Sequence, residues 1–174
     1  MADSSNIRIV THPEPALVDS LSSLLQDGVA GGASIGFLGP LSATDARQYW
    51  HSVFAALGPE LVLWVAQDQD QVVGSVQLAP SAKQNARHRA EVQKLLVRSS
   101  HRAPGLAGRL MAELEPFARR SGRGLLLLDT QTGSHADRVY RHLAWQRVGE
   151  VPGHAADPHG NLQDTTIFFK QLSK

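Results

Sequence analysis

Residues 102–111, RAPGLAGRLM, place an arginine and several very small residues directly before a segment with helical periodicity. The start of a helix leaves backbone N–H groups without partners and carries about half a positive charge. Small side chains let a ligand reach those N–H groups, so this segment is suited to bind an anion, most naturally phosphate. The dinucleotide fingerprint GxGxxG and the P-loop lysine are both absent. Taken alone, the same residues are also consistent with a turn that only packs a strand against a helix.

Two carboxylates, Glu91 and Asp129, lie in segments whose other residues are largely apolar, where a charged side chain needs a partner or a function. A carboxylate in such a position can orient an ammonium group and accept its proton, directly or through water. Alternatively, Glu91 pairs with Arg87 or Arg89 on the surface, and Asp129 caps the following turn. The sequence leaves both interpretations open.

Other groups of polar residues are less specific. Ser134, His135 and Asp137 are too close in sequence for a hydrolytic triad, and the GxSxG motif is absent, so we expect them to cap a helix. His154, Asp157 and His159 have side chains that can bind a metal, but their spacing in a turn-rich segment is unspecific. We therefore predict no metal site.

The spacing of apolar residues predicts the elements that hold these side chains. In the first half of the chain it indicates a strand at 7–10, a helix closed by Asp27 and Gly28, a glycine-rich loop at 28–40, and a second helix with Ser42 and Asp45 as a capping box. A hairpin from 61–67 and 71–80 follows, and then a strand at 88–97.

Beyond residue 97 the apolar period changes from two to 3.6, which predicts a helix from about residue 106 to Gly122. The continuous apolar run 124–130 predicts a parallel strand covered on both faces. The rest of the chain indicates a short helix at 134–143, a strand at 145–151, a polar loop at 151–161 and a last strand at 165–172. The order βααβββαβαββ predicts an α/β fold with a mixed sheet and helices on both faces.

Composition limits the possible functions. A chain of 174 residues predicts one domain, 1–174. With 17 Lys and Arg against 16 Asp and Glu, the charge argues against a nucleic-acid partner. The absence of cysteine excludes disulfides, thiolate metal sites and a cysteine nucleophile. We find neither a signal peptide nor an apolar run of about eighteen residues, so we expect a cytoplasmic protein with no membrane partner.

The segment AEVQKLLV at 90–97, the motif R-x-x-G-x-A at 102–107 and Tyr140 before a strand together resemble the GNAT superfamily of acetyl-CoA-dependent N-acetyltransferases. The order of elements resembles this superfamily over nearly the whole chain. The stretches HRAEVQKLLV, GLLLLDT, RVGEVPG and GGASIGF are similar to the tabtoxin-resistance type, which inactivates a small amino-acid-like toxin. The resemblance implies the GNAT fold, in which a mixed, mostly antiparallel sheet splays open between two strands.

The resemblance also implies a site for acetyl-CoA as cosubstrate, without a metal. The backbone of three strand residues would pair with the amides of pantetheine: Leu95, Leu96 and Val97. The pyrophosphate would be bound by the side chain of Arg102 and by N–H groups around five residues: Ala103, Gly105, Leu106, Ala107 and Gly108.

Two residues depart from the usual GNAT pattern. Pro104 removes one N–H donor from the phosphate site, which lowers the expected affinity or requires a bridging water. Ala144 stands where the superfamily often has glycine, which puts the local turn geometry in doubt. Arg98 and Arg109 are either further phosphate ligands or ordinary solvated arginines.

The resemblance places Tyr140 beside the sulfur of the coenzyme. Full proton transfer from a phenol to a thiolate is uphill by about 2 kcal/mol at ordinary pKa values, so a hydrogen bond to the developing thiolate is the expected role. The alternative is a tyrosine packed against the sheet with its hydroxyl at the rim. Glu91 and Asp129 would orient the acceptor ammonium and accept its proton. Regular alternation places four residues of strand 88–97 on one face: Glu91, Gln93, Leu95 and Val97.

The resemblance thus predicts an enzyme that moves acetyl to a primary amine, with a small amino-acid-like toxin or metabolite as acceptor and toxin resistance as a possible outcome. Two alternatives stay open, a protein N-acetyltransferase and a regulatory module that binds acyl-CoA without turnover. The sequence does not distinguish a monomer from a homodimer.

Overall fold

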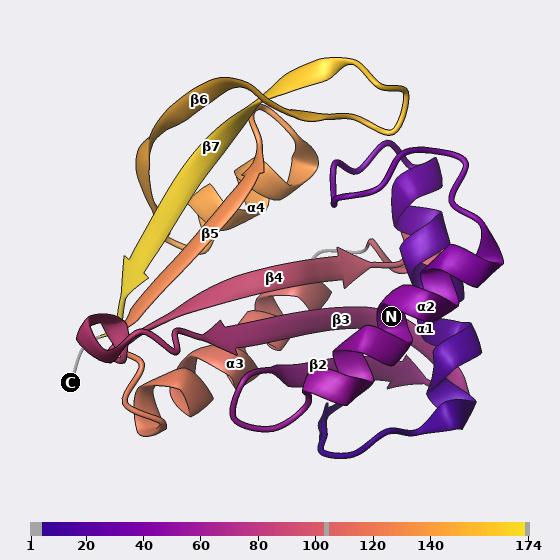
Figure 1. Ribbon diagram of the computed structural model, residues 1–174, viewed down its shortest axis with the longest axis horizontal. Helices are drawn as coiled ribbons and strands as arrows, with labels where there is room; N and C mark the ends of the chain where they lie inside the picture. The colour runs from indigo at the N-terminus through magenta and orange to yellow at the C-terminus, as the bar shows by residue number, and fades with distance from the viewer. Residues whose placement is uncertain (1–4, 103–104, 173–174) are drawn as a thin grey trace.

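The computed structural model describes residues 5–102 and 105–172 (Figure 1). Its elements, apart from two short 3-10 turns, are β1 (Asn6–Val10), α1 (Pro15–Ala30), α2 (Ala43–Ala56), β2 (Val62–Asp68), β3 (Gln71–Pro80), β4 (Arg89–Val97), α3 (Leu106–Arg120), β5 (Leu125–Gln131), α4 (His135–His142), β6 (Gln146–Ala156) and β7 (Leu162–Gln171). The predicted order βααβββαβαββ is confirmed. The predicted roles of Ala103 and Pro104 fall outside the described residues.

The strands form one seven-stranded sheet in the order β1-β2-β3-β4-β5-β7-β6. All neighbours are antiparallel except β4 and β5, which run parallel and pair only from Arg89↔Leu125 to Glu91↔Leu127. Beyond Glu91 the two strands diverge, and Figure 1 shows β3 and β4 opening away from β5 and β7. The predicted mixed, mostly antiparallel and splayed sheet is confirmed.

Helices cover both faces of the sheet because apolar side chains alternate along the central strands. Leu63 and Val65 of β2 pack with α1 and α2, whereas Trp64 and Ala66 pack with α3. In the part of the chain that the structure describes, no helix is long and apolar enough to cross a membrane.

The helix ends mostly follow the predicted capping. The side chain of Ser42 accepts a hydrogen bond from the N–H of Asp45, and that of Ser134 accepts one from the N–H of Asp137, as predicted. Helix α1 instead continues past its predicted end at Gly28 to Ala30. A Cβ on Gly28 would lie 3.3 Å from Ile35, so this glycine lets the following loop pack against the helix.

A β-bulge interrupts β4 at Lys94. Ser75 of β3 pairs with Leu96 and Gln77 pairs with Gln93, so two residues of β4 oppose one of β3. Lys94 has a left-handed φ of 49°. The extra residue reverses the alternation of side chains, because Leu96 packs with α1 and α2 on the face opposite to Val92. The prediction of one continuous face from Glu91 to Val97 is therefore wrong.

Strand β5 is not covered on both faces, contrary to the prediction from its apolar run. Leu126 and Leu128 are buried against α3 and α4, but Leu125 and Leu127 are only partly buried, and Leu127 lines a cavity. On this second face the apolar side chains of β5 form part of the floor of that cavity.

Strand β6 extends to Ala156, through most of the predicted loop at 151–161. It is an edge strand, and its register with β7 shifts between Val151 and Ala155. An edge strand tolerates Pro152 and Gly153 because the missing or misdirected hydrogen bonds face away from the sheet. The prediction of a loop from Pro152 and Gly153 is therefore wrong for residues 151–156.

Candidate active site

Two cavities follow one another along β4 and β5. The first, which we call the carboxylate cavity, has a volume of about 450 Å³ and lies where the two strands are paired, between Glu91 and Asp129. The second, which we call the α3 groove, has a volume of about 800 Å³. It lies between the splayed strand ends, the end of α1 with its following loop, the start of α3, and α4.

The start of α3 presents unpaired backbone donors to the α3 groove. Gly105 precedes the helix with a φ of 129°, a conformation that favours glycine. The first helical hydrogen bond runs from Arg109 N–H to Gly105 O at 2.8 Å, so the N–H groups of three residues have no helical partner: Leu106, Ala107 and Gly108. Gly105, Ala107 and Gly108 line the groove. The Leu106 side chain is buried in the core, which leaves only its backbone for a ligand.

Arg102 reaches the same groove from the end of β4. Its Nη2 lies 3.1 Å from the position of a Cβ on Gly31, so the glycine makes room for the guanidinium. Asp27 lies nearby: burial alone would raise the pKa of this carboxyl, but hydrogen bonds from Ser99 and the charges of Arg98 and Arg102 outweigh it and lower the pKa. Asp27 thus partly offsets the charge that Arg102 brings to the groove.

Arg98 and Arg109 have structural contacts. Arg98 is 8% exposed and donates to the carbonyl oxygen of Val72 at 3.2 Å. Arg109 donates to the hydroxyl and carbonyl oxygens of Ser5. Neither arginine lines the α3 groove, and Arg98 is not solvated.

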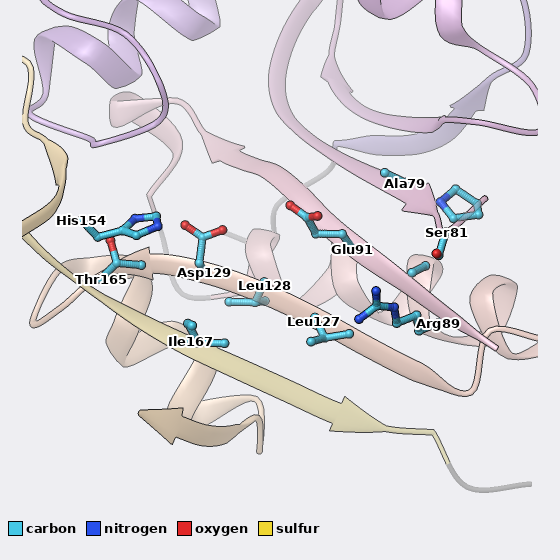
Figure 2. A pocket seen from close by; sticks show the side chains of 12 residues that line it. Ala79, Ser81, Arg89, Glu91, Leu127, Leu128, Asp129, His154, Thr165 and Ile167 are labelled. Carbon is cyan, nitrogen blue, oxygen red and sulfur yellow. The ribbon is translucent and has the colours of Figure 1, made fainter. Parts of the chain in front are cut away.

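The carboxylate cavity contains both predicted carboxylates. Figure 2 shows Glu91 and Asp129 reaching into it from neighbouring strands. The carboxylate of Glu91 accepts a hydrogen bond from Gln93 at 3.0 Å. Within residues 5–102 and 105–172, Glu91 forms no ion pair with Arg87 or Arg89, and the side chain of Asp129 accepts no hydrogen bond. The two structural alternatives for these carboxylates, a surface ion pair and a turn cap, are not found there.

Tyr140 is packed beneath the sheet. Its ring lies 5.9 Å from that of Trp145 and 6.1 Å from that of Phe168, and the residue is 6% exposed. Burial raises the pKa of the Tyr140 phenol, and the charge of Asp129 raises it further. Its neighbours Val139 and Leu143 line the α3 groove, whereas the ring itself belongs to the core. Tyr140 thus lies within reach of the charge of Asp129, but it lines neither of the two cavities.

This geometry can be compared with that of known proteins. The model of the Acetyltransferase (GNAT) family matches residues 34–145 of the chain. The chain belongs to the GNAT family of acetyltransferases. This family membership confirms the N-acetyltransferase class predicted from the sequence.

Among curated proteins, this GNAT protein is similar to an uncharacterized N-acetyltransferase in the hisH-hisA intergenic region of Azospirillum brasilense. The two are 32% identical over 133 residues, and this match covers 75% of this chain and 77% of the relative. The ribosomal-protein-alanine N-acetyltransferase of Brucella melitensis has the same fold, with a TM-score of 0.77, 22% identity, and coverage of 96% and 99% of the two chains. The yncA protein of Salmonella typhimurium, solved with acetyl-CoA, also has a TM-score of 0.77, with 17% identity and coverage of 99% and 96%. The tabtoxin-resistance type remains a prediction.

Lys94 of this GNAT protein was not identified from the sequence. Its ammonium Nζ lies 5.5 Å from the centroid of the Tyr49 ring, in the range of a cation–π interaction. Burial lowers the pKa of Lys94, and the charges of Asp129 and Glu91 partly oppose that shift. Sequence reasoning missed it because the bulge, rather than the regular alternation, directs this side chain toward α2.

The turn between β6 and β7 explains the predicted histidine cluster. Asp157 accepts hydrogen bonds from the backbone N–H groups of His159 and Asn161, at 2.9 and 3.0 Å, and so organises the turn. His154 lines the carboxylate cavity instead. The described part of the chain holds no group of three His, Asp or Glu side chains close enough to bind a metal.

Proposed function

We propose that this GNAT protein transfers an acetyl group from acetyl-CoA to the primary amine of a small acceptor. The observation that carries this proposal is the succession of the two cavities along β5. Asp129 lines the carboxylate cavity and Thr130, the next residue, lines the α3 groove. A coenzyme in the groove and an amine at the carboxylates would meet near these two residues.

The α3 groove fits the coenzyme in shape and in the chemistry of its donors. The N–H groups at the start of α3, with the guanidinium of Arg102, suit a pyrophosphate. Leu95, Leu96 and Val97 line the groove where β4 has left β5, which supports the proposal that their backbone groups pair with the amides of pantetheine. Acetyl-CoA would supply the acetyl group as a thioester.

Glu91 and Asp129 would prepare the acceptor. An alkyl ammonium is almost fully protonated at neutral pH and must lose a proton before its nitrogen lone pair can attack the thioester carbonyl. Either carboxylate would accept that proton, directly or through water. The new C–N bond then replaces the C–S bond, and the sulfur leaves as a thiolate.

Tyr140 would stabilise the leaving thiolate by donating a hydrogen bond. A phenol is protonated at neutral pH and can donate, and the raised pKa of Tyr140 keeps it protonated at alkaline pH as well. This raised pKa favours a hydrogen bond over complete proton transfer to sulfur.

The cavity favours a small acceptor over a protein. Its volume of about 450 Å³ is that of a typical small-molecule pocket, and Leu127 and Ile167 give it an apolar floor. Together with the sequence resemblance to the tabtoxin-resistance type, this supports an amino-acid-like toxin or metabolite as acceptor, and toxin resistance as the biological outcome.

Binding and turnover test the proposal separately. At a hundredfold excess over its dissociation constant, acetyl-CoA should stabilise the fold by about 2.7 kcal/mol in thermal unfolding. Arg102→Ala should weaken binding in calorimetry, whereas Arg120→Ala, on an exposed residue at the other end of α3, should not. Absence of both heat and stabilisation at millimolar acetyl-CoA would overturn the proposal. Binding without release of free coenzyme A for any primary amine would instead indicate a module without turnover.

A further inference from the structure

We propose that Arg89 binds an anionic group of the acceptor, so that the enzyme selects amines that carry a carboxylate or similar anion a short chain away from the attacking nitrogen. This inference rests on the proposed function. It concerns a cation in the carboxylate cavity that the proposed chemistry does not use.

Arg89 and Ser81 form one end of the carboxylate cavity. Figure 2 shows both residues to one side of Glu91, with Asp129 and His154 to the other side. The backbone N–H of Ser81 donates to the carbonyl oxygen of Arg89 at 3.1 Å, which holds the two residues together. The cavity thus has a guanidinium and a hydroxyl at one end and two carboxylates beyond them.

Arg89 is half-buried, and its guanidinium has no partner among the residues that the structure describes. In the described ranges its side chain makes no hydrogen bond or ion pair, although a guanidinium has five N–H donors. Two other arginines of this chain are paired with carboxylates: Arg8 lies 2.6 Å from Glu14, and Arg141 lies 2.7 Å from Asp137. The planar guanidinium group can donate two parallel hydrogen bonds to one carboxylate. Arg89 is therefore suited to an anion that the ligand supplies.

Ser81 can add a hydrogen bond to the same anion. Its hydroxyl oxygen accepts a long hydrogen bond from the N–H of Lys83 at 3.4 Å. Its own O–H stays available as a donor, since a hydroxyl donates and accepts at the same time.

The spacing along β4 sets the length of the acceptor. Arg89 and Glu91 are two residues apart on one face, before the bulge, which corresponds to roughly 6.6 Å. Leu127 of β5 pairs with Glu91 and gives this part of the cavity an apolar floor. An ammonium at Glu91 and an anion at Arg89 would thus be joined by an apolar chain of about four to five carbons, given that strand spacing.

Lys94 does not offer the same contact. It also lies near the two carboxylates, but it sits on the Tyr49 ring and does not line the carboxylate cavity. An anion bound there would lie toward the α3 groove, where the thioester is expected.

A series of amino acids with increasing chain length tests this inference. The probes are glycine, 3-aminopropanoate, 4-aminobutanoate, 5-aminopentanoate and 6-aminohexanoate, each compared with the alkylamine of equal carbon number, and release of coenzyme A gives kcat/KM. We expect the largest value for 4-aminobutanoate or 5-aminopentanoate. It should exceed that of the matched alkylamine by about tenfold to a hundredfold, which hydrogen bonds to a charged group supply.

Three variants assign this preference to the guanidinium. Arg89→Met should lower kcat/KM for the favoured amino acid to the value that the same variant shows for the matched alkylamine. Arg89→Lys, which keeps the charge but not the planar fork, should retain part of the preference. Arg87→Met, on an exposed residue outside the cavity, should retain all of it. Calorimetry with 5-aminopentanoate and the protein saturated with coenzyme A should show heat for Arg87→Met and none for Arg89→Met.

The outcomes separate the two proposals. If alkylamines are acetylated as fast as the amino acids, or if the preference survives in Arg89→Met, the role of Arg89 is wrong and the proposed function stands. If neither amines nor amino acids release coenzyme A, the proposed function fails as well. Should Arg89→Met not fold, the wild-type series and Arg89→Lys decide the question.

Discussion

Burial and the charge of Asp129 raise the pKa of the Tyr140 phenol, so we expect its ionisation to lie outside the working pH range of the enzyme. We expect Tyr140→Phe to lower kcat on the order of a hundredfold, as for the loss of one donor to a developing negative charge. The alkaline limb of the pH profile should keep its position, and the dissociation constant of acetyl-CoA should not change. Packing against Trp145 and Phe168 is retained in Phe. An unchanged kcat, measured where chemistry limits the rate, would remove Tyr140 from the mechanism.

Glu91 should matter most at low pH, where little of the acceptor is free amine. Glu91→Gln keeps an oxygen for the hydrogen bond from Gln93 and loses the charge. We expect a higher KM for the acceptor or a lower kcat below neutral pH, with partial recovery as the pH rises, and an affinity for acetyl-CoA within about threefold. A pH profile parallel to the wild type, measured alongside Asp129→Asn, would assign the proton transfer to Asp129 or to solvent.

Single residues in strands were predictable where the pattern was local. The carboxylates Glu91 and Asp129 stood out because their neighbours are apolar, and the structure brings both to one cavity. Lys94 did not stand out, since its orientation depends on how β4 pairs with β3. The residue type at position 94 does not reveal that β4 shifts its register against β3 at this point.

The bulge in β4 leads to a testable prediction about the backbone conformation of Lys94. A left-handed φ costs an L-residue roughly 1–2 kcal/mol, and glycine is exempt. We therefore expect Lys94→Gly to be more stable than Lys94→Ala by about 1 kcal/mol in urea unfolding, although glycine normally weakens a strand. Both variants lose the contact with Tyr49, so the comparison isolates the backbone. Equal stability, or a more stable alanine variant, would show that Lys94 lacks this conformation in solution.

The order and type of the elements followed from the sequence because periodicity and caps are local. The capping boxes at Ser42 and Ser134 are examples. The errors at β5 and β6 arose from tertiary context. The sequence could not show that the second face of β5 forms a cavity floor, or that Pro152 and Gly153 lie in an edge strand.

The whole fold should lose stability at alkaline pH through its two tyrosines. Burial raises the pKa of Tyr49 to about 12, although its hydrogen bond with Gln77 acts against the shift, and the pKa of Tyr140 is also raised. Unfolded tyrosine ionises near pH 10, so the unfolded chain releases these protons first. The stabilisation is complete below about pH 10 and is lost as the pH rises toward about 12, by about 1.4 kcal/mol per pH unit for each tyrosine.

Urea unfolding across this pH range checks the expected slope. Tyr49→Phe should remove about half of the tyrosine contribution to the slope, even if the unpaired Gln77 lowers the stability at every pH by about 1–3 kcal/mol. A slope identical to that of the wild type would show that Tyr49 ionises normally in the folded protein.

Asp129 lines the carboxylate cavity and the next residue, Thr130, lines the α3 groove, yet no described residue lines both. Each substrate would then occupy its own compartment, and neither would have to leave before the other arrives. The chain also has no cysteine that could carry the acetyl group between two half-reactions. Initial rates should therefore give double-reciprocal lines that intersect, the signature of a ternary complex, and parallel lines would indicate a ping-pong cycle through a covalent acetyl-enzyme.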